Sequence, residues 1–339
     1  FNECDLVPNI LNSVGEPDLT TKVFGTKIDM PIFLSPTAMQ SLYHPDGDKA
    51  SALAAEKFGT IYSMSTMASF SIEEISNLSK GPKIFQLYIH KDQSITDDLI
   101  DRCKVANFNG MCITVDTIVA GNRERDHRTG FTTPPKFTLE SLFSFAMRPH
   151  WVFNYFTNKK FELANIKHKT DKGTNIAKSV MDYINEQYDP AMNWKDAEYV
   201  VKKWDGPIAL KGVMSVEDAK KAIDIGCTAI MISNHGGRQL DGSRSPFDQV
   251  KAISDAVGDK LEIILDGGVR RGTHVLKAIA AGATACSFGK AFLFSLGAGG
   301  QKGIERLLQN FKDEIRRNMI LMGCKNIKDL DQSKIIYRK

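Results

Sequence analysis

The sequence predicts a (β/α)8 TIM barrel with a long insertion after the fourth strand. Two observations support this prediction. Short runs of strand-forming residues alternate with longer segments of helical period, which is typical of βαβ units and a parallel sheet. About eight such pairs are present, followed by a helical tail over residues 291–322, and that number fits a closed barrel better than an open doubly wound sheet. We therefore expect residues 1–339 to form one barrel domain.

The eight strands are expected where short β-rich runs end in polar residues or glycine, at 30–36, 60–65, 83–89, 110–116, 207–212, 228–234, 261–267 and 283–289. Helices are expected between them, at 48–58, 71–78, 94–107, 193–204, 215–225, 247–257 and 271–281. Two of these helices begin with a capping residue, because Ser71 and Ser215 are each followed by glutamate in the first turn.

The composition indicates which class of protein this is and which kinds of partner it is expected to bind. Hydrophobic content of 42% and charged content of 25% are ordinary for a globular protein. A net charge of +4 suits an anionic ligand or membrane surface but lacks the concentrated basic stripe of nucleic-acid binders, so no nucleic acid partner is expected. The six cysteines are scattered without a C-x-x-C pair, so we expect a reducing compartment, no disulfide framework and no metal.

The C-terminal ends of the strands are the expected site of chemistry, as in other barrels of this class. Those ends carry polar residues or glycine almost throughout: Thr37-Ala38, Ser65-Thr66, Gln86 and Tyr88, Thr114 and Asp116, Lys211, Asn234-His235, Asp266-Gly267-Gly268, and Gly289-Lys290. We therefore expect one cavity to which every strand contributes.

The motif SNHGGRQLDG at the sixth strand end suggests acid–base chemistry. His235 is followed by two glycines that let backbone and ligand approach closely, and Asp116 at the fourth strand end could orient the imidazole. Arg238 and Arg123 would lie near the same mouth, where planar guanidinium groups can grip a carboxylate. The expected substrate is a small anionic acid.

The seventh and eighth strand ends, LDGGVRRGTH and SFGKAF, predict a phosphate site. Glycine-rich turns that lead into helices expose backbone N–H groups, and Arg270 and Lys290 would add positive charge. No G-x-G-x-x-G or Walker A pattern is present, which disfavours a dinucleotide or kinase site. Lys211, in ALKG, could be a Schiff-base nucleophile, a salt-bridge partner or a cation beside an electron-accepting ring.

The insertion at about 117–191 is far longer than an ordinary βα loop. Its segment 137–161 is rich in aromatic residues and also carries Arg148, Lys159 and Lys160. One interpretation is a helical excursion packed on the barrel or on a sister subunit. The other is a monotopic membrane patch, with aromatic side chains at the headgroup level and basic residues on anionic lipid.

Taken together, SNHGGRQLD, LDGGVRRG, QLY, ALKG, and TVD followed by GNRERD resemble the FMN-dependent L-α-hydroxy acid oxidase/dehydrogenase family. The match begins at LSPTAM and runs in order to the C-terminal helix. Within this family, the insertion and the later WKD and WDGP are most similar to membrane-associated bacterial L-lactate dehydrogenases.

The resemblance implies a role for each matching residue. His235 would be the active-site base with Asp116 as its partner, and Met67 would limit the size of the substrate side chain. Substrate carboxylate and hydroxyl would be bound by Arg123, Arg238 and Tyr88. FMN would be held by Thr37, Ala38, Ser65, Gln86, Thr114, Lys211, Asp266, Gly267, Gly268, Arg270, Gly289 and Lys290. Lys211 would face N1 of the flavin, and Asp266 would bind the ribityl chain. The phosphate would be held by Gly268, Arg270, Gly289 and Lys290.

Two departures from the family pattern stand out. The family usually has arginine after the glycine of the eighth strand end, whereas this chain has Lys290. Lysine keeps the charge but cannot form the bidentate hydrogen bonds of a guanidinium group. The family's second substrate-contacting tyrosine would lie upstream of residue 1. The N-terminal segment of the family is therefore expected to be missing from the sequence.

The leading hypothesis is FMN-dependent oxidation of L-lactate to pyruvate, with electrons passed to a membrane quinone. The alternatives are a soluble glycolate- or lactate-type oxidase that makes hydrogen peroxide, a mandelate-type dehydrogenase, and a non-catalytic flavin-binding protein. The resemblance implies a homotetramer. The expected location is the cytoplasmic face of the inner membrane, as a peripheral protein, or the cytoplasm.

Overall fold

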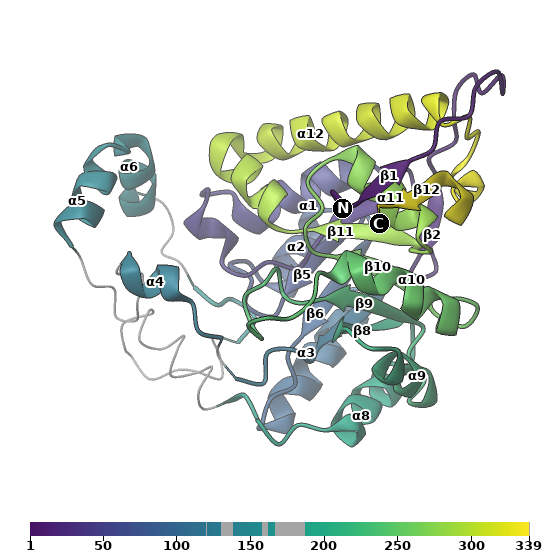
Figure 1. The fold of residues 1–339 in the computed structure, drawn as a ribbon. Coiled ribbons are helices and arrows are strands. Elements are labelled where there is room, and N and C mark those ends of the chain that lie inside the picture. The colour runs from purple at the N-terminus through teal and green to yellow at the C-terminus, as the bar shows by residue number, and fades with distance from the viewer. Residues whose placement is uncertain (120, 130–137, 158–161, 167–186, 339) are drawn as a thin grey trace.

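The computed structural model describes residues 1–119, 121–129, 138–157, 162–166 and 187–338 (Figure 1). Eight parallel strands form a closed barrel in the order β10-β11-β4-β5-β6-β7-β8-β9. They are β4 (Ile32–Leu34), β5 (Tyr62–Ser65), β6 (Lys83–Leu87), β7 (Gly110–Thr114), β8 (Ile208–Val213), β9 (Ala229–Ser233), β10 (Glu262–Asp266) and β11 (Ala285–Phe288). The predicted TIM barrel is confirmed, and only β8 extends beyond its predicted range, by one residue.

The helices that follow the strands cover the outside of the barrel. They are α1 (Gly47–Lys57), α2 (Ile72–Leu78), α3 (Gln93–Val105), α8 (Trp194–Trp204), α9 (Val216–Asp224), α10 (Pro246–Val257), α11 (Gly272–Ala280) and α12 (Lys290–Leu321). Both predicted caps are present, because Ser71 accepts from the backbone of Glu74 and Ser215 from that of Asp218. The continuous final helix was predicted without the kink that the structure has at Gly299 and Gly300.

A hairpin that the sequence did not predict closes one end of the barrel. It joins β2 (Thr21–Val23) to β3 (Thr26–Ile28) through Phe24 and Gly25, which both have positive φ. Such a turn matches the twist of two antiparallel strands. Its apolar side chains, including Phe24, pack inside the barrel with residues from the first halves of the strands, such as Ile84. The hairpin therefore plugs the end of the barrel opposite the predicted site.

The two ends of the described chain also pair. β1 (Cys4–Leu6) runs antiparallel to β12 (Ile335–Tyr337), and two short 3-10 helices, η3 (Ile327–Asp329) and η4 (Gln332–Lys334), precede β12. Arg338 donates to the Asp5 carboxylate across this pair. The contact brings together segments more than 300 residues apart in the sequence.

The insertion between β7 and α8 contains α4 (Glu124–Arg128), α5 (Leu139–Ala146) and α6 (Pro149–Thr157). Figure 1 shows α5 and α6 standing away from the barrel. A hydrogen bond connects α6 to the segment after β4: Trp151 Nε1 donates to the carbonyl of Leu42 in η1 (Gln40–Leu42) at 2.9 Å. Within the described ranges, no helix combines the length and apolar character needed to cross a membrane.

Candidate active site

His235 lies in a tight turn directly after β9. His235, Gly236 and Gly237 have positive φ angles of 57°, 68° and 72°. This conformation is uncommon for a residue with a Cβ, and it persists only where surrounding contacts hold it. One such contact is the backbone N–H of His235, which donates to Ser233 Oγ at 3.1 Å. The turn therefore fixes the His235 backbone at the end of the strand.

The His235 imidazole is paired with the Asp116 carboxylate. His235 Nδ1 lies 3.0 Å from Asp116 Oδ1, and the Thr117 hydroxyl donates to the same oxygen at 3.2 Å. Burial acts to raise the pKa of Asp116, but Lys211 and the hydrogen bond from His235 outweigh it and hold that pKa below its usual value. Because an ionised carboxylate only accepts hydrogen bonds, Nδ1 carries the proton and Nε2 keeps its lone pair.

The charge state of His235 suits a proton acceptor. Burial, together with the positive charge of Lys211, lowers the pKa of His235 below its usual 6.5, and the contact with Asp116 opposes this only in part. A neutral imidazole near pH 7, oriented by a carboxylate, is the arrangement that general bases use. The predicted pairing of His235 with Asp116 is therefore present in the structure.

Asp116 reaches its position because of an irregularity in β8. The register of β8 against β9 shifts between Lys211 and Val213, and Gly212 has a φ of +108°. A Cβ added to Gly212 would lie only 2.7 Å from the Cβ of Asp116. The glycine of ALKG therefore leaves room for the carboxylate to pack against the neighbouring strand, a role that the sequence pattern did not indicate.

The two predicted arginines lie close enough to influence each other. Burial and the positive charge of Arg238 both lower the pKa of Arg123. The Nε of Arg123 is buried and has no hydrogen-bond partner among the residues that the structure describes, while the Arg238 side chain is exposed. Two neighbouring cations with an unused donor favour an anionic ligand, and guanidinium groups bind carboxylates well.

Tyr88 lies among the same charged groups. Burial raises the pKa of Tyr88, and Lys211, Asp116 and Arg123 are near enough to influence it. Tyr88 is therefore a neutral phenol that can donate a hydrogen bond. Met67 is buried, and its backbone carbonyl accepts from the N–H of Met39, which joins the loop after β5 to the loop after β4.

Lys211 and Asp266 form a buried ion pair at the centre of the barrel mouth. Lys211 Nζ lies 3.5 Å from Asp266 Oδ2, and three serine hydroxyls from three strands or strand ends donate to the same carboxylate, those of Ser35, Ser233 and Ser287. Burial acts against both charges, but their mutual attraction wins, so the pKa of Asp266 lies below its usual value and that of Lys211 above. The serine donors were not predicted.

Three buried polar atoms at the strand ends test whether a flavin fits. Thr37 Oγ1, Gln86 Nε2 and Thr114 Oγ1 have no hydrogen-bond partner among the described side chains and backbone. A buried polar group without a partner costs about 1–3 kcal/mol, so nearly all such groups are satisfied. All three residues were predicted to hold FMN, and the polar edge of its ring could supply the partners. The residues present therefore fit FMN.

The predicted phosphate residues also meet at one place. Gly267 and Gly268 have φ angles of 131° and 74°, which leave their backbone free to turn toward a ligand. Lys290 begins α12 and donates from Nζ to the Gly236 carbonyl at 3.0 Å. Burial, Arg238 and Arg270 together lower the pKa of Lys290. This cluster of positive charge therefore extends from the phosphate residues to the turn that carries His235.

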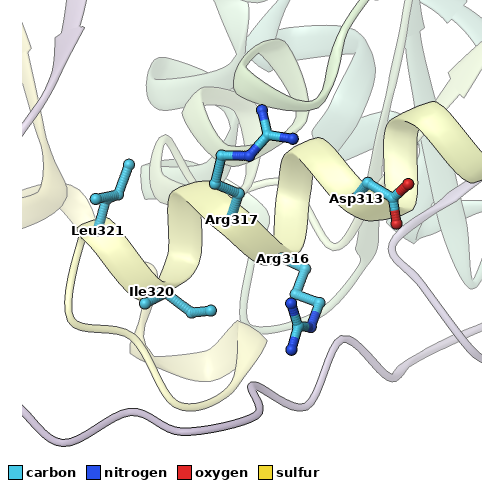
Figure 2. Close-up of a pocket in the computed structure, with 5 residues that line it drawn as sticks. All are labelled: Asp313, Arg316, Arg317, Ile320 and Leu321. Carbon is cyan, nitrogen blue, oxygen red and sulfur yellow. The ribbon is translucent and has the colours of Figure 1, made fainter.

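A hollow on the outer side of α12 lies apart from these residues (Figure 2). It is lined by Asp313, Arg316, Arg317, Ile320 and Leu321. Arg316 already forms an ion pair with Glu16, with Nε 2.6 Å from Oε1. The hollow contains none of the predicted site residues.

The comparisons with known proteins agree with the geometry. A family model described as FMN-dependent dehydrogenase matches residues 1–337. The chain belongs to this family. It is 38% identical over 328 residues to glycolate oxidase of Spinacia oleracea, covering 97% of this chain and 83% of that protein. It is 36% identical over 337 residues to L-lactate oxidase of Nostoc sp., with 98% and 87% covered.

Further relatives include both a dehydrogenase and a membrane protein. The chain is 35% identical over 337 residues to L-lactate dehydrogenase of Acinetobacter baylyi, covering 99% of this chain and 87% of that protein. The crystal structure of the monotopic membrane protein (S)-mandelate dehydrogenase matches with a TM-score of 0.93 at 29% identity, covering 99% of this chain and 89% of that one. The predicted family and FMN cofactor are therefore confirmed, and the activity is FMN-dependent oxidation of a 2-hydroxy acid.

Proposed function

We propose that this FMN-dependent dehydrogenase oxidises L-lactate to pyruvate. The observation that carries this proposal is the pairing of His235 with Asp116 beside two arginines, with the Met67 side chain buried at the same mouth. Such a site suits a small acid with one carboxylate and one ionisable hydroxyl. FMN, when bound, supplies the chemistry by accepting two electrons from the substrate.

Each protein group has a distinct part in this proposal. Arg123 and Arg238 bind the substrate carboxylate, and Tyr88 donates to the substrate hydroxyl. His235 accepts one proton from the substrate at Nε2 while Asp116 stabilises the resulting imidazolium. Together these contacts fix the substrate Cα with respect to the base.

The flavin contacts form a second set. Thr37, Ala38, Ser65, Gln86 and Thr114 would surround the ring, and Lys211 would place its charge at N1. The remaining contacts, to the ribityl chain and phosphate, would come from Asp266, Gly267, Gly268, Arg270, Gly289 and Lys290.

Anaerobic reduction of the bound flavin by a panel of acids tests this function. We expect L-lactate to bleach the flavin absorbance with a higher kcat/KM than glycolate or (S)-mandelate. Faster reduction by glycolate would support the glycolate-oxidase alternative, and faster reduction by mandelate the mandelate-type alternative. Bleaching by none of these acids would contradict the proposal and favour a non-catalytic flavin protein.

We further propose that the electrons pass to a membrane quinone rather than to oxygen, at the cytoplasmic face of the inner membrane. The support is the apolar surface of α5 and α6, where Leu139 is 88%, Phe143 69% and Phe156 78% exposed beside the exposed Arg148. Exposed apolar surface of this kind marks interaction sites. Phe137, Lys159, Lys160 and Phe161 of the same predicted patch lie outside the described residues. A peroxide assay in air would detect the competing oxidase.

Replacing Phe143, Phe153 and Phe156 by serine should release the protein from membranes without loss of FMN. Each buried apolar side chain contributes about 1.5–3 kcal/mol, so losing three would weaken membrane binding by several orders of magnitude. Sedimentation with anionic vesicles would measure this. Phe294→Ser is the control, because Phe294 is 75% exposed on α12. Unchanged sedimentation of the triple variant would refute a membrane role for the patch.

We also propose that residues 1–339 act as one barrel domain and that the protein forms a homotetramer. A tetramer would carry four copies of helices α5 and α6 that could bind the same membrane, and such multivalency strengthens binding. Light scattering of the detergent-free protein would measure the assembly, and a monomeric mass would contradict it.

A further inference from the structure

Tyr188, at the end of the insertion, lies among the proposed substrate residues. Its side chain is buried, with 7% exposed. The Tyr188 ring centroid is 5.0 Å from that of Tyr88, and the Tyr188 hydroxyl donates toward Met67 Sδ at 3.8 Å. Tyr188 also interacts electrostatically with Arg123. One side chain thus contacts or influences three of the residues assigned to substrate.

The backbone on both sides of Tyr188 is anchored. The carbonyl of Gln187 accepts from the N–H of Lys91 at 2.9 Å, which fastens the segment to the loop after β6. On the other side, the carbonyl of Asp189 accepts from the N–H of Met192, and the Asp189 side chain accepts from Ala191. Because these bonds fix the chain before and after Tyr188, its ring is held against Tyr88 and Met67.

This placement puts Tyr188 beside the proposed position of the substrate. A 2-hydroxy acid has four groups on Cα: the carboxylate, the hydroxyl, a hydrogen and the side chain. In the proposed pose the arginines bind the first and Tyr88 the second, and the resemblance implies that the side chain lies at Met67. Tyr188 also borders a small cavity with Tyr88, Thr114 and Met192. The hydroxyl-to-sulfur contact brings Tyr188 up to Met67, so in this pose a larger side chain would meet both residues.

We propose that Tyr188 is a specificity-determining residue that, together with Met67, sets the upper size of the substrate side chain. The site then takes 2-hydroxy acids with a methyl or similarly small side chain and rejects aryl side chains by steric overlap. This inference rests on the proposed function, because it assumes the binding pose described there. It also identifies the insertion as part of the substrate site.

The test compares Tyr188→Ala, Tyr188→Phe and the parent by stopped-flow anaerobic flavin reduction. L-lactate, L-2-hydroxybutyrate and (S)-mandelate are used, and limiting rates and apparent Kd values are measured separately. In Tyr188→Ala we expect the ratio of kcat/KM for mandelate to that for lactate to rise at least about tenfold, since pocket size discriminates by roughly 10- to 200-fold. Tyr188→Phe keeps the ring and should change the ratio less than about threefold.

Controls separate the possible failures. Tyr199→Phe alters an exposed tyrosine on α8 whose hydroxyl donates to Asp97, and should leave the ratio unchanged. If Tyr188→Ala fails to fold, Tyr188→Leu keeps apolar volume and should still raise the ratio for mandelate. An unchanged ratio in a folded, flavin-loaded variant overturns the inference. A parent that prefers mandelate overturns both the proposed lactate activity and the rejection of aryl side chains. A parent that prefers lactate, with an unchanged ratio in Tyr188→Ala, overturns the role of Tyr188 alone.

Discussion

Replacing His235 by glutamine should lower the limiting rate of flavin reduction by L-lactate by about 10²- to 10⁴-fold, the usual contribution of a general base. Glutamine has a similar length and can still hydrogen-bond to Asp116, but it cannot accept the substrate proton. Apparent binding of lactate should change little, because Arg123 and Arg238 remain. Stopped-flow reduction under anaerobic conditions separates the two quantities.

The matched control is His150→Gln, which removes an exposed histidine on α6 and should reduce flavin at the parent rate. Equal rates in His235→Gln and the parent would show that another group takes the proton. A slow variant that regains its rate at high pH would instead point to hydroxide replacing the lost base.

The same pair of residues fixes the pH dependence of the parent. Because burial and Lys211 lower the pKa of His235 below 6.5, kcat/KM for lactate should be at its plateau at pH 7 and fall as the pH drops below 6.5. Asp116 acts in the opposite direction and raises the pKa of His235. In Asp116→Asn the acidic limb should therefore move to lower pH while the plateau also falls, since the imidazole loses its orienting carboxylate.

The barrel and most of its mouth could be predicted because their signals are local. Strand periodicity placed each barrel strand to within a few residues, and residues at strand ends must converge when a sheet closes. His235 and Asp116 are 119 residues apart, yet both follow a strand, and the structure brings them to 3.0 Å. This pairing could be predicted because it depends on where the strands end in the barrel and not on the details of side-chain packing.

Other features depend on contacts that no local pattern encodes. The β2–β3 hairpin requires positive φ at Phe24, a conformation that its residue type does not favour. Ser35 and Ser287 look like ordinary strand residues until three strands bring them to Asp266. Tyr188 lies at the end of the insertion, and its contact with Met67, 121 residues away, cannot be deduced from periodicity. For Ser35 and Tyr188 the partner is more than 100 residues away in the sequence.

Replacing Lys211 by methionine should destabilise the apoprotein by about 3–5 kcal/mol, because removing one member of a buried ion pair leaves its partner charged and uncompensated. Lys211 is 3% exposed, and its partners include Asp266 at 3.5 Å and the nearby charge of Asp116. The serine hydroxyls on Asp266 remain, so we expect the lower end of that range. FMN binding should weaken as well, since the cation proposed to lie at N1 is lost. Urea unfolding of apoprotein and flavin titration measure the two effects separately.

The surface variant Lys203→Met is the matched control. Lys203 pairs with Asp97 at 3.2 Å near solvent, where an ion pair contributes about 0–1 kcal/mol. A loss in Lys211→Met no larger than in this control would show that the buried charge is not the cause.

The double variant Lys211→Met with Asp266→Asn distinguishes charge from packing. If an uncompensated carboxylate causes the instability, neutralising it should recover part of the lost stability, whereas a packing defect would persist. Acid provides the same test without a second substitution. In Lys211→Met, burial is no longer opposed by Lys211 and only the serine hydrogen bonds still lower the pKa, so the pKa of Asp266 should rise above its value in the parent. The free energy of unfolding should then differ most between the variant and the parent at neutral pH. The difference should shrink as the pH falls and Asp266 takes up a proton.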